Sequence, residues 1–288
     1  MILIIGASGY IGRNLFQRFR EESYDVVGTY AQHPREGLIH FDLETSSLAD
    51  LPQKPDYVFL CSVAYHSLDD SKRYWERAYS LDVIQIKRIL DYCFAHNIIP
   101  LYFSSDNVFD GAKGNYIESD ARNPITGYGR LKFEVENYLL SSGKPGVILR
   151  MGKVFGVTPG DNTLITTMVS DLVIQRKKIQ CATDQLISPL FINDLFYFTK
   201  KIIDEKITGV YHLTSLIPLT RYNLARSIIN FFNLDNNLAS PCEFRNLKLL
   251  DQRPNLIDLN DEKSRELTRQ IKVGLPYYLG EIKKNLFH

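Results

Sequence analysis

A tyrosine and a lysine stand four residues apart near the middle of the chain, as Tyr128 and Lys132. On a helix, residues at this spacing share one face and lie one turn apart. A phenol with its usual pKa of about 10 is a poor acid–base catalyst at neutral pH unless a nearby cation lowers that pKa. The Lys132 ammonium could supply this cation, which indicates a proton-transfer pair. The alternative is a solvated surface pair.

A serine, Ser105, follows a short apolar run at residues 98–103 that we interpret as a buried strand. Doubly wound folds bind their ligands at the carboxyl ends of such strands. The Ser105 hydroxyl is therefore expected to meet a ligand, next to Asp106 and Asn107. No G-x-S-x-G sequence surrounds this serine, which argues against a hydrolase nucleophile.

The chain opens with an apolar run, 1–5, and a G-x-x-G-x-x-G pattern. Such a turn lets backbone N–H groups approach a pyrophosphate, and the helix that follows points the positive end of its dipole at it. Strand, glycine turn and amphipathic helix in this order predict a dinucleotide site, and a merely structural turn is the alternative. The residues expected to contact the cofactor here are Gly6, Ser8, Gly9, Tyr10, Ile11, Gly12 and Arg13.

The region after the second predicted strand, 24–30, bears on the choice of cofactor. Folds that bind NAD usually place an acid there to hold the ribose 2′-hydroxyl, and this chain has none before Glu36. Arg35, together with Arg13, could accept a 2′-phosphate, although each arginine could equally be a solvated charge. The sequence therefore favours NADP as the cofactor, with NAD as the alternative.

Apolar runs alternate with helical patterns through the first half of the chain. This alternation predicts an α/β fold, a Rossmann doubly wound parallel sheet with helices on both faces. After residue 150 the pattern loosens. We expect 1–150 to form the nucleotide-binding domain and 151–288 mainly a smaller C-terminal substrate-binding domain, parts of which return to the first. The helices expected are 10–21, 69–96 (broken once), 127–140, 162–176, 194–205 (after an N-cap at Asn193) and 221–232, and 233–260 is expected to be irregular.

Composition narrows the classes of function. The 34 basic and 33 acidic residues nearly cancel, so there is no electrostatic reason to expect a nucleic-acid or membrane partner. No stretch reaches the ~18 apolar residues of a membrane span. The four cysteines form no C-x-x-C pair and the six histidines show no ligand spacing. We therefore expect reduced thiols, a cytoplasmic location and no metal site.

Together these motifs resemble those of the extended short-chain dehydrogenase/reductases, most closely the dTDP-4-dehydrorhamnose reductase family. That family shows S-T-D-x-V-F-D-G, and residues 104–111 of this chain read SSDNVFDG. The resemblance continues along nearly the whole chain, through many short motifs in the right order. The matching residues are Gly114, Tyr116, Glu118, Asp120, Pro124, Gly160, Asp161, Asn162, Asp184, Gln185, Ser188, Pro189, Asn193, Asp194, Arg253 and Pro254.

The resemblance implies NAD(P)H-dependent reduction of a 4-keto sugar linked to a nucleotide. Ser105 would orient or polarise the carbonyl, Tyr128 would donate the proton as hydride arrives, and Lys132 would hold the nicotinamide ribose and lower the pKa of Tyr128. Further residues implied at the cofactor are Asp42, Leu43, Val63, Ala64 and Tyr65. Those implied at the small-molecule nucleotide sugar, besides Ser105, are Asp106, Asn107, Lys153, Asn162 and Arg253.

Two positions depart from the family. Asp82 stands where many relatives carry an asparagine in the central helix, and Lys153 where many rhamnose-pathway reductases have a tryptophan against the sugar. A lysine lacks that flat apolar surface, though it could meet a phosphate or a hydroxyl.

Two other functions therefore stay open. One is an epimerase or dehydratase on the same fold, for which Asp106 is a candidate acid. The other is a regulatory subunit without catalysis, like that of methionine adenosyltransferase. Many members of the family are dimers, so a homodimer is one option, although no sequence patch requires it.

Overall fold

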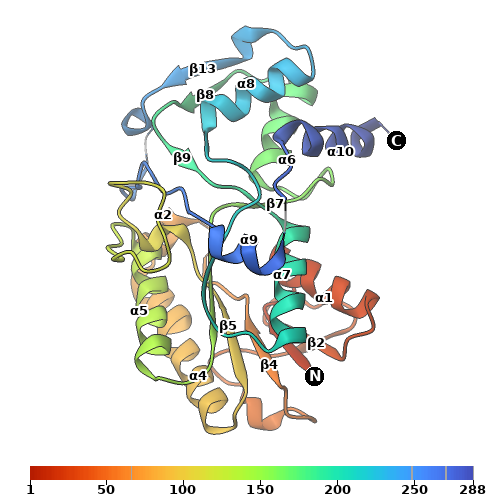
Figure 1. Cartoon of the computed structure of the whole chain (residues 1–288), viewed down its shortest axis with the longest axis vertical. Coiled ribbons are helices and arrows are strands. Elements are labelled where there is room, and N and C mark those ends of the chain that lie inside the picture. The colour runs from red at the N-terminus through yellow and green to blue at the C-terminus, as the bar shows by residue number, and fades with distance from the viewer. Residues whose placement is uncertain (66, 248, 270, 288) are drawn as a thin grey trace.

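The computed structural model describes residues 1–65, 67–247, 249–269 and 271–287. Its central sheet has the order β11-β6-β5-β4-β1-β2-β3, and every neighbouring pair is parallel (Figure 1). This is the 3-2-1-4-5-6 order of a doubly wound fold with one strand added at an edge, which confirms the predicted fold class. The strands are β1 (Ile2–Ile5), β2 (Val26–Tyr30), β3 (Leu38–His40), β4 (Tyr57–Leu60), β5 (Ile99–Phe103), β6 (Val147–Met151) and β11 (Gly209–Leu213).

One face of the sheet is covered by α1 (Tyr10–Glu21) and α7 (Ile192–Glu205), which pack against each other (Figure 1). Their apolar side chains, Leu15 and Phe19 on α1 and Phe196 on α7, join the sheet in one core. An amphipathic helix laid on a parallel sheet buries one stripe in this way. Both α7 and β11 come from the second half of the chain, yet they complete the first domain's layers.

The opposite face carries α5 (Gly127–Ser141) and a long helical segment. The sequence predicts one helix with a single break there. The structure has a break at Tyr74 and also a π-helical turn, which widens the helix without erasing its apolar spacing, so the pattern does not reveal it. The segment consists of α2 (Leu68–Arg73), α3 (Trp75–Tyr79), the π-helical stretch Ser80–Gln85 and α4 (Ile86–Ala95).

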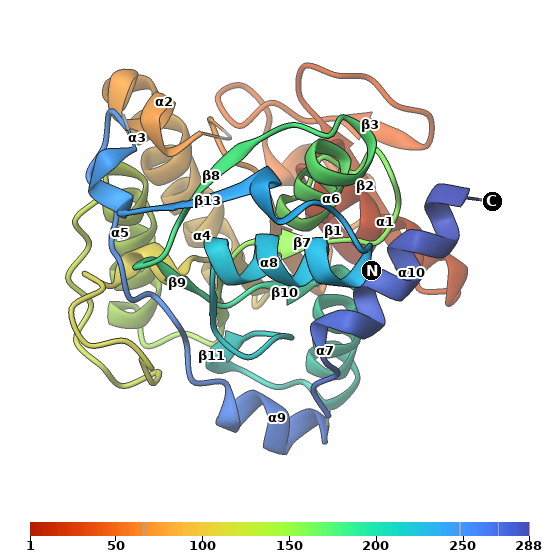
Figure 2. The same cartoon turned by 90° about the horizontal axis from the view of Figure 1, so that it is seen from above.

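Residues after 150 build a second lobe beyond the carboxyl edge of the sheet (Figures 1 and 2). The prediction of irregular structure for 233–260 is wrong in part, because β13 pairs in parallel with β8 there. Pro241 interrupts the sequence pattern of this strand, so the strand was not predicted. A proline is tolerated in an edge strand, where the missing N–H leaves no neighbouring strand unpaired. The lobe contains α6 (Leu164–Val169), the π-helical stretch Ser170–Ile174, β8 (Ile179–Ala182), α8 (Arg221–Phe231), β13 (Ala239–Cys242) and α10 (Leu275–Phe287).

Short pairs of strands lie where the two lobes meet, and one helix packs on β11 and α7. These are β7 (Val154–Phe155) with β10 (Leu190–Phe191), β9 (Leu186–Ile187) with β12 (Leu219–Thr220), and α9 (Glu262–Thr268). The predicted N-cap of α7 is wrong: Phe191, not Asn193, holds that position. Asp194 then lies inside the first turn, where its carboxylate accepts the Ser215 hydroxyl and a negative charge suits the helix dipole.

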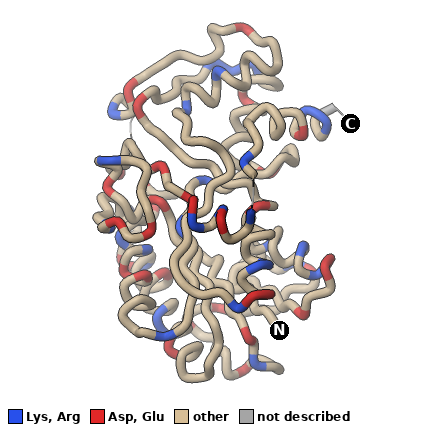
Figure 3. The backbone as a smooth tube through the Cα atoms, viewed as in Figure 1, with Lys and Arg blue, Asp and Glu red and all other residues tan. Residues whose placement is uncertain are grey.

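Acidic and basic residues are interspersed along the whole backbone (Figure 3). Within the described part of the chain, no helix is long and apolar enough to cross a membrane.

A buried carboxylate, Glu136 on α5, ties that helix to the sheet. Its side chain is fully buried, and it accepts Nη2 of Arg150 on β6 at 2.8 Å and Nη1 of Arg122 at 2.9 Å. The Ser104 hydroxyl, at the end of β5, donates to the same carboxylate. A charge taken out of water needs such partners, so this cluster holds α5 in one place on β5 and β6.

We expect Arg150→Met to lower the free energy of unfolding by about 3 kcal/mol, because it leaves the buried Glu136 charge poorly compensated. Urea denaturation followed by circular dichroism measures this loss. Arg245→Met, at an exposed ion pair, is the matched control and should change stability little. Equal midpoints for the two variants would contradict the role given to the pair.

Candidate active site

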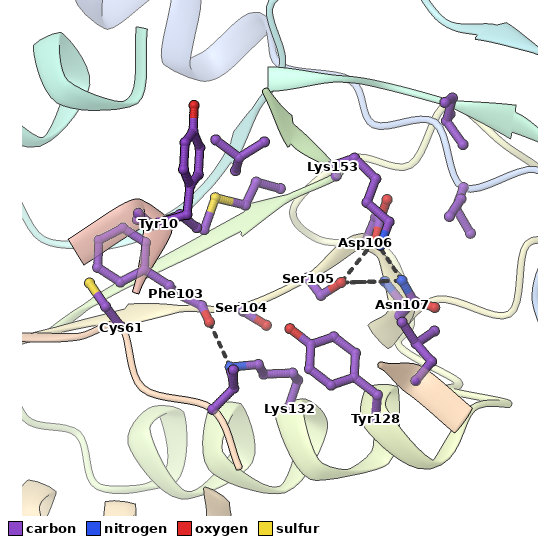
Figure 4. A pocket seen from close by; sticks show the side chains of 18 of the residues that line it. Tyr10, Cys61, Phe103, Ser104, Ser105, Asp106, Asn107, Tyr128, Lys132 and Lys153 are labelled. Carbon is purple, nitrogen blue, oxygen red and sulfur yellow. Dashed lines mark hydrogen bonds between the residues drawn. The ribbon is translucent and has the colours of Figure 1, made fainter. Parts of the chain in front are cut away.

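A cavity of about 350 Å³ opens at the carboxyl edge of the sheet. The turn after β1, the loops after β4 and β5, helix α5 and the second lobe all line it (Figure 4). The strand order reverses between β1 and β4, and this switch point is where doubly wound folds bind ligands. The predicted site residues that line it are Gly9, Tyr10, Ile11, Gly12, Val63, Tyr65, Ser105, Asp106, Asn107, Tyr128, Lys132, Lys153 and Arg253.

The glycine turn adopts the close packing that its pattern predicts. Gly6 has φ +88°, and a Cβ on Gly12 would lie 2.4 Å from the Gly6 carbonyl oxygen. Helix α1 starts directly after Gly9 with no side-chain cap. Its first backbone N–H groups are therefore available to a ligand, and an anion suits this end of the helix. Ser8 belongs to the same turn but does not line the cavity.

Tyr10 joins the glycine turn to the second lobe. Its hydroxyl donates to Asp161 at 3.3 Å, and burial, followed by the Asp161 charge, raises the pKa of this phenol. Asn162 comes next, with φ 53°, and is a predicted substrate residue that does not line the cavity.

Ser105, Asp106 and Asn107 form one hydrogen-bonded group at the end of β5 (Figure 4). The Ser105 hydroxyl donates to Asp106 at 2.8 Å and accepts the Asn107 backbone N–H at 3.2 Å. Asp106 is buried, and burial raises its pKa to about 6 against the hydrogen bonds from its two neighbours. The group can present a hydroxyl and an amide to a ligand carbonyl.

Tyr128 and Lys132 lie on the first turns of α5, which begins where Thr126 caps the Gly129 N–H at 2.8 Å. The Lys132 ammonium donates to the Phe103 carbonyl at 2.9 Å and lies 5.5 Å from the centre of the Tyr128 ring. Figure 4 shows the phenol oxygen directed into the space between Ser105 and Lys132. The fold therefore brings together the three residues that were predicted to act together.

The pKa of Tyr128 departs from the expectation that Lys132 lowers it. Burial raises this pKa, and the charges of Asp82 and Asp106 raise it further. Burial is the largest cause, the two carboxylates add to it, and the Lys132 ammonium is bound to a backbone carbonyl instead. The phenol is protonated at neutral pH, which is the state a proton donor must start from.

Three cations from separate elements line the end of the cavity nearest the second lobe: Lys153, Arg221 and Arg253. Arg221, at the start of α8, donates to Gln185 at 3.2 Å, and Arg253 donates to Asp69 at 3.0 Å. Burial lowers the pKa of Lys153, and the neighbouring Arg221 lowers it further. Sequence reasoning missed Arg221, because no motif surrounds it and only folding brings α8 to the cavity.

Arg13 and Arg35 line a second cavity of about 650 Å³ beside Ala7. Arg20, which the sequence pattern did not single out, lines it too, about two helical turns beyond Arg13 on α1. Asp42 and Leu43 line neither cavity, and the Asp42 carboxylate accepts the Glu44 N–H of its own turn.

In the described ranges there is no group of three or more His, Cys, Asp or Glu residues that could hold a metal ion. His66 and His288, which entered the prediction of no metal site, lie outside the described residues.

The sequence model of the family described as "RmlD substrate binding domain" matches residues 1–281. The chain belongs to this family. The predicted resemblance to dTDP-4-dehydrorhamnose reductases is thereby confirmed at the level of the family, and family membership spans both lobes.

The curated relatives of the chain include proteins of two kinds. The chain is 29% identical over 237 residues to a dTDP-4-dehydrorhamnose reductase of Aggregatibacter actinomycetemcomitans, covering 80% of this chain and 78% of that protein. It is 26% identical over 248 residues to methionine adenosyltransferase 2 subunit beta of Xenopus tropicalis, covering 83% and 74%.

Among solved structures, a dTDP-4-dehydrorhamnose reductase from Clostridium acetobutylicum superposes with a TM-score of 0.82 at 25% identity, covering 100% of this chain and 99% of that one. The fold is also that of a Bacillus anthracis dTDP-4-dehydrorhamnose reductase in complex with NADP, with a TM-score of 0.79, 21% identity and coverage of 99% and 98%.

We expect Gly12→Ala to destabilise the fold by about 2 kcal/mol, because the new Cβ would meet backbone atoms at 2.4–2.9 Å that cannot move independently. Differential scanning calorimetry measures the fall in Tm. Gly280→Ala is the control: its Cβ meets nothing within 4 Å on α10, so the change should be neutral or stabilising. A Gly12→Ala protein as stable as the wild type would disprove the tight packing of the turn.

Proposed function

We propose that the chain is an NADPH-dependent oxidoreductase that reduces the carbonyl of a 4-keto sugar linked to a nucleotide, as dTDP-4-dehydrorhamnose reductases do. The observation that carries the proposal is the convergence of Ser105, Tyr128 and Lys132 on one cavity that also reaches the glycine turn. A purely regulatory protein would not need this set. The reductase among the curated relatives supports the same reaction.

The residues present suit a dinucleotide. The free N–H groups at the start of α1 and the bare backbone at Gly9 and Gly12 fit a pyrophosphate, and Val63 and Tyr65 fit the path toward the nicotinamide. When bound, the reduced cofactor supplies the hydride.

The chain's own residues would then handle the oxygen of the substrate carbonyl. The Ser105 hydroxyl, which donates to Asp106 in this structure, would turn to donate to the carbonyl oxygen and polarise it. The protonated Tyr128 delivers the proton as negative charge develops there. The positive charge of Lys132 stabilises the phenolate left behind, and its free N–H groups hold the ribose. Walls of Met151 and Ile187 keep water from this space.

The charge of the cavity supports a nucleotide-linked substrate. A diphosphate carries about two negative charges, and Arg221, Arg253 and Lys153 face the end where it would lie. Residues 151–288 supply all three cations, in keeping with the expected division into a cofactor domain and a mainly substrate-binding domain. We place the enzyme in the cytoplasm, a location that its four free cysteines suit. A homodimer stays a prediction.

Purified protein should oxidise NADPH with at least one 4-keto sugar from a panel linked to dTDP, UDP and GDP. Tyr128→Phe removes the proton donor, so kcat should fall by about 100-fold or more while NADPH still binds. Tyr138→Phe, on the exposed part of the same helix, should behave as wild type. A continuous absorbance assay of NADPH oxidation measures kcat, and a fluorescence titration measures NADPH binding.

Silence across the panel with cofactor still bound would contradict the reductase. Conversion of a sugar nucleotide to its epimer without net oxidation would then favour an epimerase. A protein partner captured without any turnover would favour the regulatory function of methionine adenosyltransferase 2 subunit beta.

We also propose that NADP is preferred over NAD, because Arg13 and Arg35 line one cavity beside the glycine turn. Arg35→Ala should lower kcat/KM for NADPH about tenfold, the effect of losing one charge-assisted hydrogen bond, and leave that for NADH nearly unchanged. Arg245→Ala serves as the control for loss of a surface charge. An unchanged NADPH-to-NADH ratio would refute this assignment.

A further inference from the structure

The buried carboxylate of Asp82 lies in a stretch that packs against α5, the helix that carries Tyr128 and Lys132, and the mechanism above gives it no role. Asp82 is only 4% exposed and sits in the π-helical stretch between α3 and α4. A π-helical turn inside an α-helix is rare and is frequently found at functional sites. The buried position of an acid in such a turn calls for a physical reason.

One contact of Asp82 reaches the loop after β4, which helps to line the cavity. Its Oδ1 accepts the backbone N–H of Ala64 at 2.8 Å. Ala64 lies between Val63 and Tyr65, which both line the cavity on the side expected to meet the nicotinamide. Asp82 therefore fixes the loop after β4 to the helical layer, although Ala64 itself does not line the cavity.

The buried ammonium of Lys132 needs a negative charge nearby. Lys132 is 3% exposed, and its ammonium is bound by a neutral carbonyl, that of Phe103. Glu136, one turn further along α5, is already paired with two arginines and has no charge to spare. The π-helical stretch that carries Asp82 packs against α5, the helix of Lys132, and the charge of Asp82 raises the pKa of Lys132. In the described part of the chain, no basic side chain comes within 4.0 Å of Asp82 itself.

We propose that Asp82 is a positioning residue that works through Lys132: it provides the buried counter-charge that keeps the ammonium protonated, and it holds the cofactor-side loop at Ala64 in register with it. This inference rests on the proposed reductase function. An asparagine at this position would keep the second role, since an amide oxygen also accepts an N–H, and would lose the first.

The pH dependence follows from the groups that face one another here. Burial lowers the pKa of Lys132, and Asp82 raises it; burial raises the pKa of Tyr128, and Asp82 raises it further. Reduction needs both groups protonated. Removing the Asp82 charge lowers the pKa of Lys132 and that of Tyr128. The loss of activity at alkaline pH therefore begins at a lower pH than in the wild type. The other groups that act on Lys132 and Tyr128 are Cys61, Asp106 and Glu136, and the charge of Asp82 also raises the pKa of the Tyr102 phenol. Burial raises the pKa of Asp82 itself, while Lys132 and the Ala64 N–H act to lower it.

The test is the pH profile of kcat for Asp82→Asn, with NADPH and the sugar nucleotide that the wild type reduces. We expect its alkaline limb to move down by about one unit, the shift caused by one buried charge nearby, with KM for NADPH within about twofold. Asp91→Asn is the matched control: it is the same change on α4, at an exposed contact with Tyr138, and its limb should stay in place.

An alkaline limb that coincides with that of the wild type would overturn the inference while leaving the reductase intact; a wild type without turnover would count against the reductase instead. If Asp82→Asn does not fold, carbon-13 NMR titration of the wild-type carboxyl groups decides. An Asp82 carboxylate that is charged at pH 7 supports the counter-charge, and one that is protonated at pH 7 overturns it.

Discussion

The parallel sheet imposes the constraint on which the rest of the structure depends. Every strand of a parallel sheet delivers its chain to the same edge, so the turn after β1 and the loops after β4 and β5 meet there. Because the order reverses between β1 and β4, the crossovers leave this edge in opposite directions and a crevice stays open. The cavity, and each residue placed in it by β5 and α5, follows from that geometry.

Buried charge is the second organising feature. Glu136 and Lys132 are both almost completely buried on α5, one turn apart, and each has a different set of partners. Glu136 is neutralised by arginines and locks the helix to the sheet, whereas Lys132 is bound by a carbonyl and keeps N–H groups free. The stabilising charges thus lie away from the cavity, and the reactive one faces it.

The second lobe determines what the cavity can hold. Its contribution is three cations and a few apolar walls around a reaction centre built entirely by the first 150 residues. The resemblance to the family places Lys153 where many rhamnose-pathway reductases carry a tryptophan. In the proposed reductase, a charged side chain there would recognise the sugar by hydrogen bonding and electrostatic attraction instead of stacking, with Ser105 and Tyr128 in their proposed roles.

Local patterns determined the parts of this protein that depend on neighbours in sequence. The glycine turn, the i, i+4 pair Tyr128 and Lys132, and the alternation of strands and helices follow from short-range sterics and periodicity, and they were predicted. Contacts between distant segments were not. Arg221 reaches the cavity only because α8 folds back, β13 pairs with β8 across some 60 residues despite Pro241, and the π-helical stretch that carries Asp82 packs against α5. Burial decides the pKa of Tyr128 as well, and burial exists only in the tertiary structure.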